Sequence, residues 1–324
     1  MCLEPACNEP ARYASGMPDP KLPDVQMNLV RPKEPVIGQL VGSESCMKGR
    51  SASFVRHVDI DVSGTPLEGN FRAGQAFGIV PPGRTQDGKL HAVRLYSIAS
   101  PSWGEDGEGK VLSTTVKRVI DERKTDDPQI HDLFLGVCSN WLCDIPLDAQ
   151  VAVTGPSGKR FLLPESPNDH NYVFVATGTG IAPFRGMVKE LLEHPDGPCT
   201  SQIHLALGVP YGTDLMYHDL FTALAQSHEN FHYHTAISRP ETGQRRYVDR
   251  AIVESEAITS LLADERTLLY MCGLKGMEDG IYRHLLEQGI VDQYLNWPDD
   301  IPREPSNVSE RKVRAGARCM VEVY

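Results

Sequence analysis

The chain has 324 residues and a formal net charge of -11, with 40% hydrophobic and 23% charged residues. This composition is typical of a folded protein rather than a disordered or fibrous one. The 43 acidic residues against 32 basic ones argue against nucleic acid or anionic membranes as general partners. The length predicts two domains, because one domain usually has roughly 100 to 200 residues.

Residues 1–30 form an N-terminal extension that is rich in proline and acidic residues and lacks the basic and apolar blocks of a secretory signal. No apolar stretch approaches the roughly 18 to 20 residues of a membrane helix. We therefore expect a cytoplasmic protein without stable membrane insertion. The eight cysteines are scattered and none forms a C-x-x-C pair, so the sequence predicts no metal site and no redox disulfide.

Residues 31–167 contain short β-branched and aromatic runs that are separated by Gly, Pro and Asp. This pattern is typical of an antiparallel barrel or sandwich. The predicted strands include Ser53 to Val62, Ala76 to Val80, Val111 to Val116 and Val151 to Thr154.

Residues 168–324 have a different pattern, in which apolar strands alternate with helical segments. It predicts a parallel α/β domain. The polar, proline-punctuated segment from Pro164 to Asp169 suits a linker between the two domains. The predicted elements are strands at Tyr172 to Ala176, Ile203 to Leu207, His232 to Ile237, Thr267 to Cys272 and Met320 to Tyr324, and a helix at Pro183 to His194.

A glycine-rich turn, from Thr177 and Gly178 to Pro183, follows the first of these strands and opens the helix. Its glycines allow backbone amides to approach a pyrophosphate at the positive end of the helix. The motif departs from G-x-G-x-x-G, because Pro183 takes the place of the third glycine. A turn of this kind without a ligand is the alternative interpretation.

The ends of the following strands favour NADP over NAD, because no acidic residue stands where a ribose would be held. Hydroxyl and guanidinium donors suit a 2'-phosphate instead. The alternative is that the arginines are surface charges paired with Glu241 and Asp249. The donors are Ser238, Arg239, Arg245 and Tyr247.

Six blocks of sequence, taken in order, resemble the plant-type (plastidic) ferredoxin-NADP reductases from about Arg31 to the carboxy-terminus. The blocks are Arg94 to Ser100, Val116 to Arg118, Gly136 to Leu142, Gly178 to Arg185, Tyr270 to Met277 and Val321 to Tyr324. The resemblance implies an antiparallel β-barrel that binds FAD, followed by an NADP-binding α/β domain with a parallel five-stranded sheet.

The resemblance also implies roles for the R-x-Y-S block, which contains Leu95. Arg94 binds the FAD pyrophosphate, Tyr96 stacks on the flavin ring and Ser97 lies beside its reactive N5 atom. These roles make chemical sense, since Arg neutralises phosphate and an aromatic face packs against the flavin. A plain half-buried strand is the competing interpretation. The second FAD loop implied by the resemblance consists of Gly136, Val137, Cys138 and Ser139.

On the nicotinamide side, the resemblance assigns the catalytic residues Cys272, Glu322 and Tyr324, together with Ser97. Tyr324 covers the flavin face opposite Tyr96 and moves when nicotinamide stacks there. The alternatives are a buried structural thiol for Cys272 and a frayed terminal strand for the other two. The resemblance adds Thr115, Lys117, Thr177, Gly178, Ser238, Arg239, Arg245 and Tyr247 to the cofactor-binding residues.

One departure from the family concerns the adenine of FAD. The family's tyrosine that stacks on adenine corresponds to Asp121 here. The sequence therefore predicts looser anchoring of the adenine.

The expected function is an FAD enzyme that transfers a hydride between NADP(H) and flavin, and single electrons to or from ferredoxin or flavodoxin. A dedicated reductase component of an oxygenase system and a non-catalytic flavin-fold interaction protein are the alternatives. Because the chain is acidic, docking of an acidic carrier requires a local basic patch. Its candidates are Arg31, Lys33, Arg311, Lys312, Arg314 and Arg318.

Overall fold

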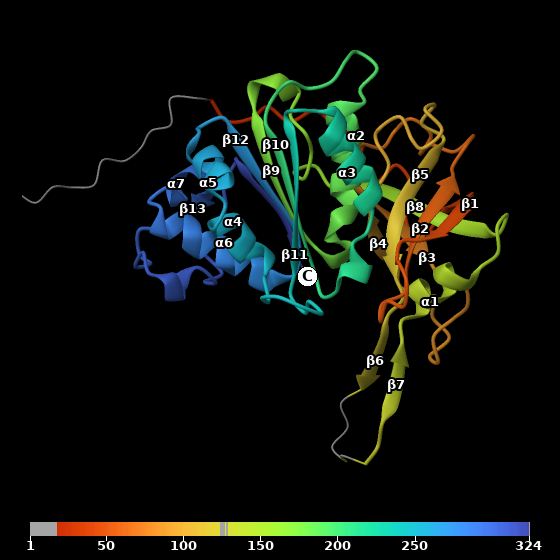
Figure 1. Cartoon of the computed structure of the whole chain (residues 1–324). Helices are drawn as coiled ribbons and strands as arrows, with labels where there is room; N and C mark the ends of the chain where they lie inside the picture. Colours follow the sequence, from red (N-terminus) through yellow and green to blue (C-terminus); the bar gives the residue numbers. More distant parts are fainter. Residues whose placement is uncertain (1–17, 124–126, 128, 324) are drawn as a thin grey trace, which may run out of the picture.

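Two sheets of different type divide the chain, as Figure 1 shows. This computed structural model describes residues 18–123, 127 and 129–323. The first sheet is antiparallel and the second is parallel, which confirms the predicted fold class. Among the described residues, no helix is long and apolar enough to cross a membrane.

The first sheet contains six strands in the order β4-β3-β8-β1-β2-β5. The sheet closes where its two edge strands meet: the Thr114 hydroxyl donates to the carbonyl of Ser97 at 2.8 Å, and the Ala99 amide donates to the carbonyl of Ser113 at 2.8 Å. Closure removes the exposed edges and gives a barrel. The strands are β1 (Val36–Ser45), β2 (Val55–Asp61), β3 (Ala76–Val80), β4 (Arg94–Ser97), β5 (Val111–Lys117) and β8 (Gln150–Ser157).

A hairpin and a short helix lie between β5 and β8. The hairpin consists of β6 (Ile120–Arg123) and β7 (Asp132–Leu135), and it projects away from the barrel (Figure 1). The helix α1 (Val137–Asp144) begins two residues after β7 ends. It packs its buried residue Leu142 into the barrel core.

The second sheet has the strand order β11-β10-β9-β12-β15, and all its strands are parallel. Helices α2 and α3 cover the face toward the barrel, and α4, α5 and α6 cover the other face (Figure 1). The strands are β9 (Asn171–Thr177), β10 (Ile203–Val209), β11 (Phe231–Ile237), β12 (Thr267–Gly273) and β15 (Cys319–Val323), and the helices are α2 (Ala182–Leu192), α3 (His218–Ser227), α4 (Val248–Val253), α5 (Glu256–Ala263) and α6 (Lys275–Glu287).

The segment between α6 and β15 is mostly irregular, above all in its proline-rich part from Trp297 to Ser309. Trp297 is nevertheless buried, and its ring nitrogen donates to the carbonyl of Ile301 at 3.0 Å. The segment therefore packs against the face of the sheet that α4, α5 and α6 cover. Its regular elements are α7 (Val291–Tyr294), β13 (Leu295–Asn296), the 3-10 turn η4 (Pro305–Asn307) and β14 (Arg314–Ala315).

One of the apolar clusters contains residues of both domains. Phe161, which follows β8, packs with Phe184 of α2 at a ring-centroid distance of 5.7 Å. The same cluster contains Val55 of β2 and Phe174 of β9. A continuous core of this kind fixes the position of one domain relative to the other, because separating the domains would expose apolar surface.

Candidate active site

The segment Arg94 to Ser97 is β4, an edge strand of the six-stranded sheet. Tyr96 and Ser97 are half-buried, whereas Arg94 and Leu95 are exposed. Among the described residues, the Arg94 guanidinium donates one hydrogen bond, a 3.4 Å contact with the carbonyl of Val93. Most of its donors are therefore available to an anion.

The segment Gly136 to Ser139 forms the start of α1. Gly136 directly precedes the helix, and the first turn contains no acidic residue; within the described part of the chain, no side chain caps the helix amides. Free amides at a helix start carry partial positive charge and bind anions. Cys138 and Ser139 are buried beneath this turn, while Val137 is exposed.

The side chains of Tyr96 and Cys138 interact electrostatically, which links these two segments. Burial raises the pKa of the Tyr96 hydroxyl, and the thiol raises it further. The ring is therefore neutral and presents an aromatic face. A guanidinium, free helix amides and an aromatic ring are the groups that a flavin dinucleotide requires, so the residues of this region fit FAD.

The carboxyl ends of the parallel strands bring together the residues of the nicotinamide side. Cys272 of β12 is the Cα partner of Ala176 in β9 and of Glu322 in β15. One residue further along β9, Thr177 is paired with Gly208 of β10. In a parallel sheet, ligands bind at this edge.

The glycine-rich turn is the 3-10 turn η2 (Gly178–Ile181), and it packs tightly against the end of β12. A Cβ atom on Gly180 would lie 2.1 Å from the carbonyl oxygen of Cys272. Gly273 has a φ of +134°, and a Cβ there would lie 2.1 Å from the Thr177 hydroxyl oxygen. That hydroxyl accepts a hydrogen bond from the Leu274 amide at 2.7 Å. Glycine at both positions thus holds the turn beside Cys272.

A cavity of about 550 Å³ lies over this turn and is lined by both domains. Its volume is within the usual range for a ligand pocket. Met47, Ser53 and Val55 line it from the barrel. The predicted cofactor-binding residues in its wall are Lys117, Thr177, Gly178, Ser238 and Tyr247.

Two predicted phosphate ligands, Arg239 and Arg245, lie outside the lining of this cavity. Each is exposed and contacts a tyrosine hydroxyl, Arg239 that of Tyr211 at 3.5 Å and Arg245 that of Tyr247 at 3.4 Å. Among the described residues, neither forms an ion pair with Glu241 or Asp249.

Arg246 lines the cavity but is missing from the predicted set. Its guanidinium also forms a 3.2 Å ion pair with Glu254 of the segment after α4. Three successive basic or amide residues precede Tyr247 in the sequence, and the sequence pattern alone does not show which of them points inward. The backbone position of this segment determines which side chain points inward, since the Arg246 amide donates to the carbonyl of Ile237 at 3.0 Å.

Burial controls the ionisation of the predicted catalytic residues. Burial raises the pKa of Glu322 to about 7. Burial, together with the negative charge of Glu322, raises the pKa of the Cys272 thiol, so this thiol stays protonated near neutral pH. The remaining predicted catalytic residue of this side, Tyr324, lies outside the described residues.

Thr115 is buried in the contact between the domains. Its hydroxyl lies 2.6 Å from the hydroxyl of Tyr217, which precedes α3. His57 of β2 reaches the same hydroxyl with Nδ1 at 2.8 Å. Thr115 therefore occupies a position between the domains rather than in the lining of the cavity.

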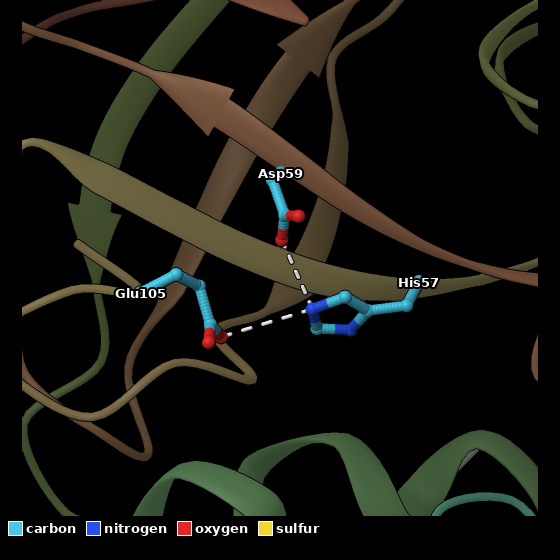
Figure 2. A group of neighbouring side chains, drawn as sticks. All are labelled: His57, Asp59 and Glu105. Atoms are coloured by element: carbon cyan, nitrogen blue, oxygen red, sulfur yellow. Dashed lines mark ion pairs between the residues drawn. The ribbon is translucent and has the colours of Figure 1, made fainter. Parts of the chain in front are cut away.

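Figure 2 shows the other side of His57, where two carboxylates approach its ring. The His57 Nε2 atom lies 3.0 Å from Asp59 Oδ1 and 3.7 Å from Glu105 Oε1. One nitrogen or oxygen atom from each of the three side chains lies within 4.8 Å of the other two. The Arg185 guanidinium of α2 donates hydrogen bonds to both carboxylate oxygens of Glu105. The Ser113 hydroxyl also donates to this carboxylate, at 2.6 Å. Because the guanidinium already neutralises Glu105, the group serves as an ionic network between the domains.

One residue predicted for the docking patch is not on the surface. Arg318 is buried, and its guanidinium donates to the carbonyl of Glu265. Lys312 is exposed but forms a 2.6 Å ion pair with Asp300. The exposed candidates that remain are Arg31, Lys33, Arg311 and Arg314.

Comparison with known proteins identifies the family. Residues 174–283 match the family model described as the oxidoreductase NAD-binding domain. A ferredoxin-NADP reductase from Spirulina sp is 38% identical over 265 residues, which cover 80% of this chain and 88% of that relative. This chain belongs to the ferredoxin-NADP reductase family.

A second family member, the chloroplastic leaf isozyme 1 of ferredoxin-NADP reductase from Oryza sativa subsp. indica, is 35% identical over 307 residues. These cover 93% of this chain and 80% of that relative. The solved ferredoxin-NADP+ reductase from Plasmodium falciparum has the same fold, with a TM-score of 0.67 at 22% identity over 92% of this chain and 99% of that one. A structure of the same reductase with 2'P-AMP gives a TM-score of 0.69 over 93% and 100%.

Proposed function

We propose that this protein is a ferredoxin-NADP reductase that binds FAD in the barrel domain, reacts with NADP(H) at the carboxyl edge of the parallel sheet, and exchanges electrons with ferredoxin or flavodoxin. The cavity that both domains line is the observation that carries the proposal, because Lys117 of the barrel and the turn at Thr177 and Gly178 both line it. Bound FAD supplies a group that accepts a hydride and passes electrons singly, which no side chain can do.

In the barrel domain, the protein's task is to hold and orient the flavin. The Arg94 guanidinium and the amides at the start of α1 bind the pyrophosphate. Tyr96 would stack on the flavin ring, next to Cys138 at the start of α1. Ser97 is small enough to hydrogen-bond the ring edge without blocking nicotinamide.

In the second domain, the task is to place nicotinamide against the flavin. Cys272, beside the glycine-rich turn, presents a small, neutral side chain, and Glu322 holds a proton that it can share with the bound ring or release. A fixed geometry of this kind lowers the barrier, because the reacting atoms need no further ordering.

The preference for NADP(H) comes from the donors beyond β11. Ser238 and Tyr247 line the cavity; Arg239 follows Ser238 in the chain and Arg245 contacts the Tyr247 hydroxyl, so both guanidinium groups neighbour the cavity wall, where a 2'-phosphate can meet them. Arg246 adds positive charge from the cavity wall. The wall also contains the carboxylates of Asp214 and Asp249, so the preference for NADP(H) rests on these hydroxyl and guanidinium donors.

The proposal includes the division into an extension at 1–30, a barrel domain at 31–167 and an NADP domain at 168–324. It also includes the expected cytoplasmic location. Because the rice relative is named chloroplastic, cell fractionation with an antibody against the full-length protein is the test of location. Recovery in an organelle would contradict the prediction.

The decisive test of function uses the purified protein. It should be yellow, and acid should release FAD rather than FMN, because FMN would leave part of the pyrophosphate site empty. NADPH should reduce ferricyanide faster than NADH does, and added ferredoxin should support reduction of cytochrome c. A colourless protein that FAD cannot reconstitute would overturn the proposal.

A further inference from the structure

The hairpin of β6 and β7 presents an exposed aromatic side chain next to the proposed pyrophosphate site. Phe134 lies in β7, two residues before Gly136, and 39% of it is exposed. An exposed phenylalanine at the edge of a ligand site is unusual, because apolar rings are normally buried. The hairpin projects from the barrel beside α1 (Figure 1).

Phe134 is the cross-strand partner of Asp121 in the antiparallel pairing of the hairpin. Directly paired residues place their side chains on the same face, and neighbours along a strand alternate between faces. One face therefore carries Asp121 and Phe134, together with the next pair, Arg123 and Asp132. The opposite face carries Leu133.

The face with Phe134 is the one that meets the start of α1. The pairing continues beyond the strands, since the Gly136 amide donates to the carbonyl of Val119 at 3.0 Å. A Cβ on Gly136 would lie 2.8 Å from Ser139 Oγ and 2.9 Å from Val119 Cβ. Gly136 is two residues after Phe134, so the same face of the chain points to the first turn of the helix.

Neighbouring charges hold the Phe134 ring in place. The Arg123 guanidinium lies 5.7 Å from the ring centroid, within the cation-π range, and forms a 3.3 Å ion pair with Asp132. A ring oriented in this way loses little conformational freedom when a base stacks on it.

We propose that Phe134 is the platform on which the adenine of FAD stacks. The inference rests on the FAD site proposed above. If the pyrophosphate binds at the start of α1, the adenosine end of the dinucleotide lies within one nucleotide of that turn, and aromatic side chains stack on bases. The carboxylate of Asp121 cannot provide a stacking surface, and Phe134 supplies one on the same face from the neighbouring strand.

The other exposed phenylalanine among the described residues, Phe54, is less suited to this role. The Arg118 guanidinium lies 4.5 Å from its ring centroid and is itself held by Asp144. A second guanidinium, that of Arg56, lies 6.0 Å from the same centroid, so two arginines crowd the Phe54 ring where one contacts Phe134. Since 43% of Phe54 is exposed, a value close to that of Phe134, Phe54 provides a matched control.

The test compares FAD with FMN, which lacks adenine. Flavin is removed from the full-length protein, and the apoprotein is titrated with each flavin while fluorescence is followed. Phe134→Ala should weaken FAD binding roughly tenfold to a hundredfold, because a stacked base contributes that much, and should leave FMN binding unchanged. Phe134→Tyr should retain FAD affinity. Phe54→Ala and Leu133→Ala should bind both flavins as the wild type does.

A rescue variant strengthens the test. Adding Asp121→Tyr to Phe134→Ala should restore FAD affinity, because the new ring stands on the same face of the hairpin. Equal FAD affinity in Phe134→Ala and wild type, or equal losses for FAD and FMN, would overturn the inference. If the wild-type apoprotein binds no FAD, the proposed function itself fails. Thermal unfolding of each apoprotein shows whether a variant is folded.

Discussion

Cys272 and Glu322 are Cα partners in the parallel pairing of β12 with β15. Their side chains therefore share one face of the sheet. Cys272 belongs to the apolar cluster shared with the barrel, as does Met320, two residues before Glu322. A thiol and a carboxyl thus stand side by side at the carboxyl edge of the sheet and face the flavin domain.

The first prediction concerns the pH dependence of the reaction. Because burial raises the pKa of Glu322 to about 7, this carboxyl changes its charge in the neutral range. The rate of ferricyanide reduction by NADPH should show an inflection near pH 7 in the wild type. Glu322→Gln cannot titrate, so its profile should be flat there. An unchanged inflection in the variant would assign the titration to another group.

The same pKa shift predicts a difference in stability between these two proteins. Between about pH 4.5 and about pH 7, the folded protein keeps a proton on Glu322 that the unfolded chain has lost. Stability contributed by this group is therefore present below that window and decreases as pH rises through it. Urea unfolding across the window should show the wild type losing stability relative to Glu322→Gln.

Much of the fold could be predicted from the sequence, because buried strands leave a clear apolar pattern. Tyr172 to Ala176, for example, is predicted as a strand, and β9 extends it by one residue at each end. The hairpin of β6 and β7 gives no such signal, since both of its strands are exposed throughout. An alternation of apolar and polar residues indicates a strand with one buried face. A hairpin that is exposed on both faces therefore lacks this pattern.

The candidate site could be predicted only where residues adjacent in sequence act together. The turn at Thr177 and Gly178 is one local motif, and the structure places it in the cavity wall. The contact of His57 with Tyr217 joins residues 160 positions apart. Nothing in the local sequence encodes such a pairing, because packing of the two domains creates it.

The second prediction concerns the ion pair between Arg185 and Glu105. Burial alone would raise the pKa of Glu105, but its hydrogen bonds and charge interaction with Arg185 hold it below the usual value. Both side chains are less than one-fifth exposed. Glu105→Ala leaves a buried guanidinium unpaired, which costs about 3 to 5 kcal/mol. Denaturant unfolding should show this loss.

An exposed ion pair provides the control for that experiment. Asp300→Ala removes the partner of Lys312, whose side chain is two-thirds exposed, and should change stability much less. Equal effects of Glu105→Ala and Asp300→Ala would mean that the pair between the domains contributes no more than a surface contact.

The third prediction concerns the electron carrier. Lys33 and Arg314 are exposed, and attraction between charges on two proteins is screened over about 8 to 10 Å at ordinary ionic strength. The rate with ferredoxin should decrease as salt rises, and the rate with ferricyanide should decrease less. Charge reversal by Lys33→Glu and Arg314→Glu should lower only the ferredoxin rate. An unaltered ferredoxin rate in both variants would exclude Lys33 and Arg314 from the docking patch.

The fourth prediction concerns the choice between NADPH and NADH. Replacing Arg239 and Arg245 with alanine removes two donors for the 2'-phosphate, so kcat/KM for NADPH should decrease roughly tenfold to a hundredfold, the usual effect of losing a charge-assisted contact. The value for NADH should stay nearly constant, because NADH has no phosphate at this position. Inhibition by 2'-phospho-AMP should weaken in parallel.

Two further variants separate this role from a general effect of charge. Arg246→Ala changes a residue of the cavity wall and should lower kcat/KM for NADPH if its guanidinium also reaches the phosphate. Arg266→Ala removes an arginine that is paired with Asp264 before β12, at the opposite end of the sheet, and should leave both nucleotides unaffected. If the double variant kept the kinetics of the wild type with NADPH while Arg246→Ala lost activity, the phosphate would be bound inside the cavity. Arg239 and Arg245 would then have no part in the preference for NADPH over NADH.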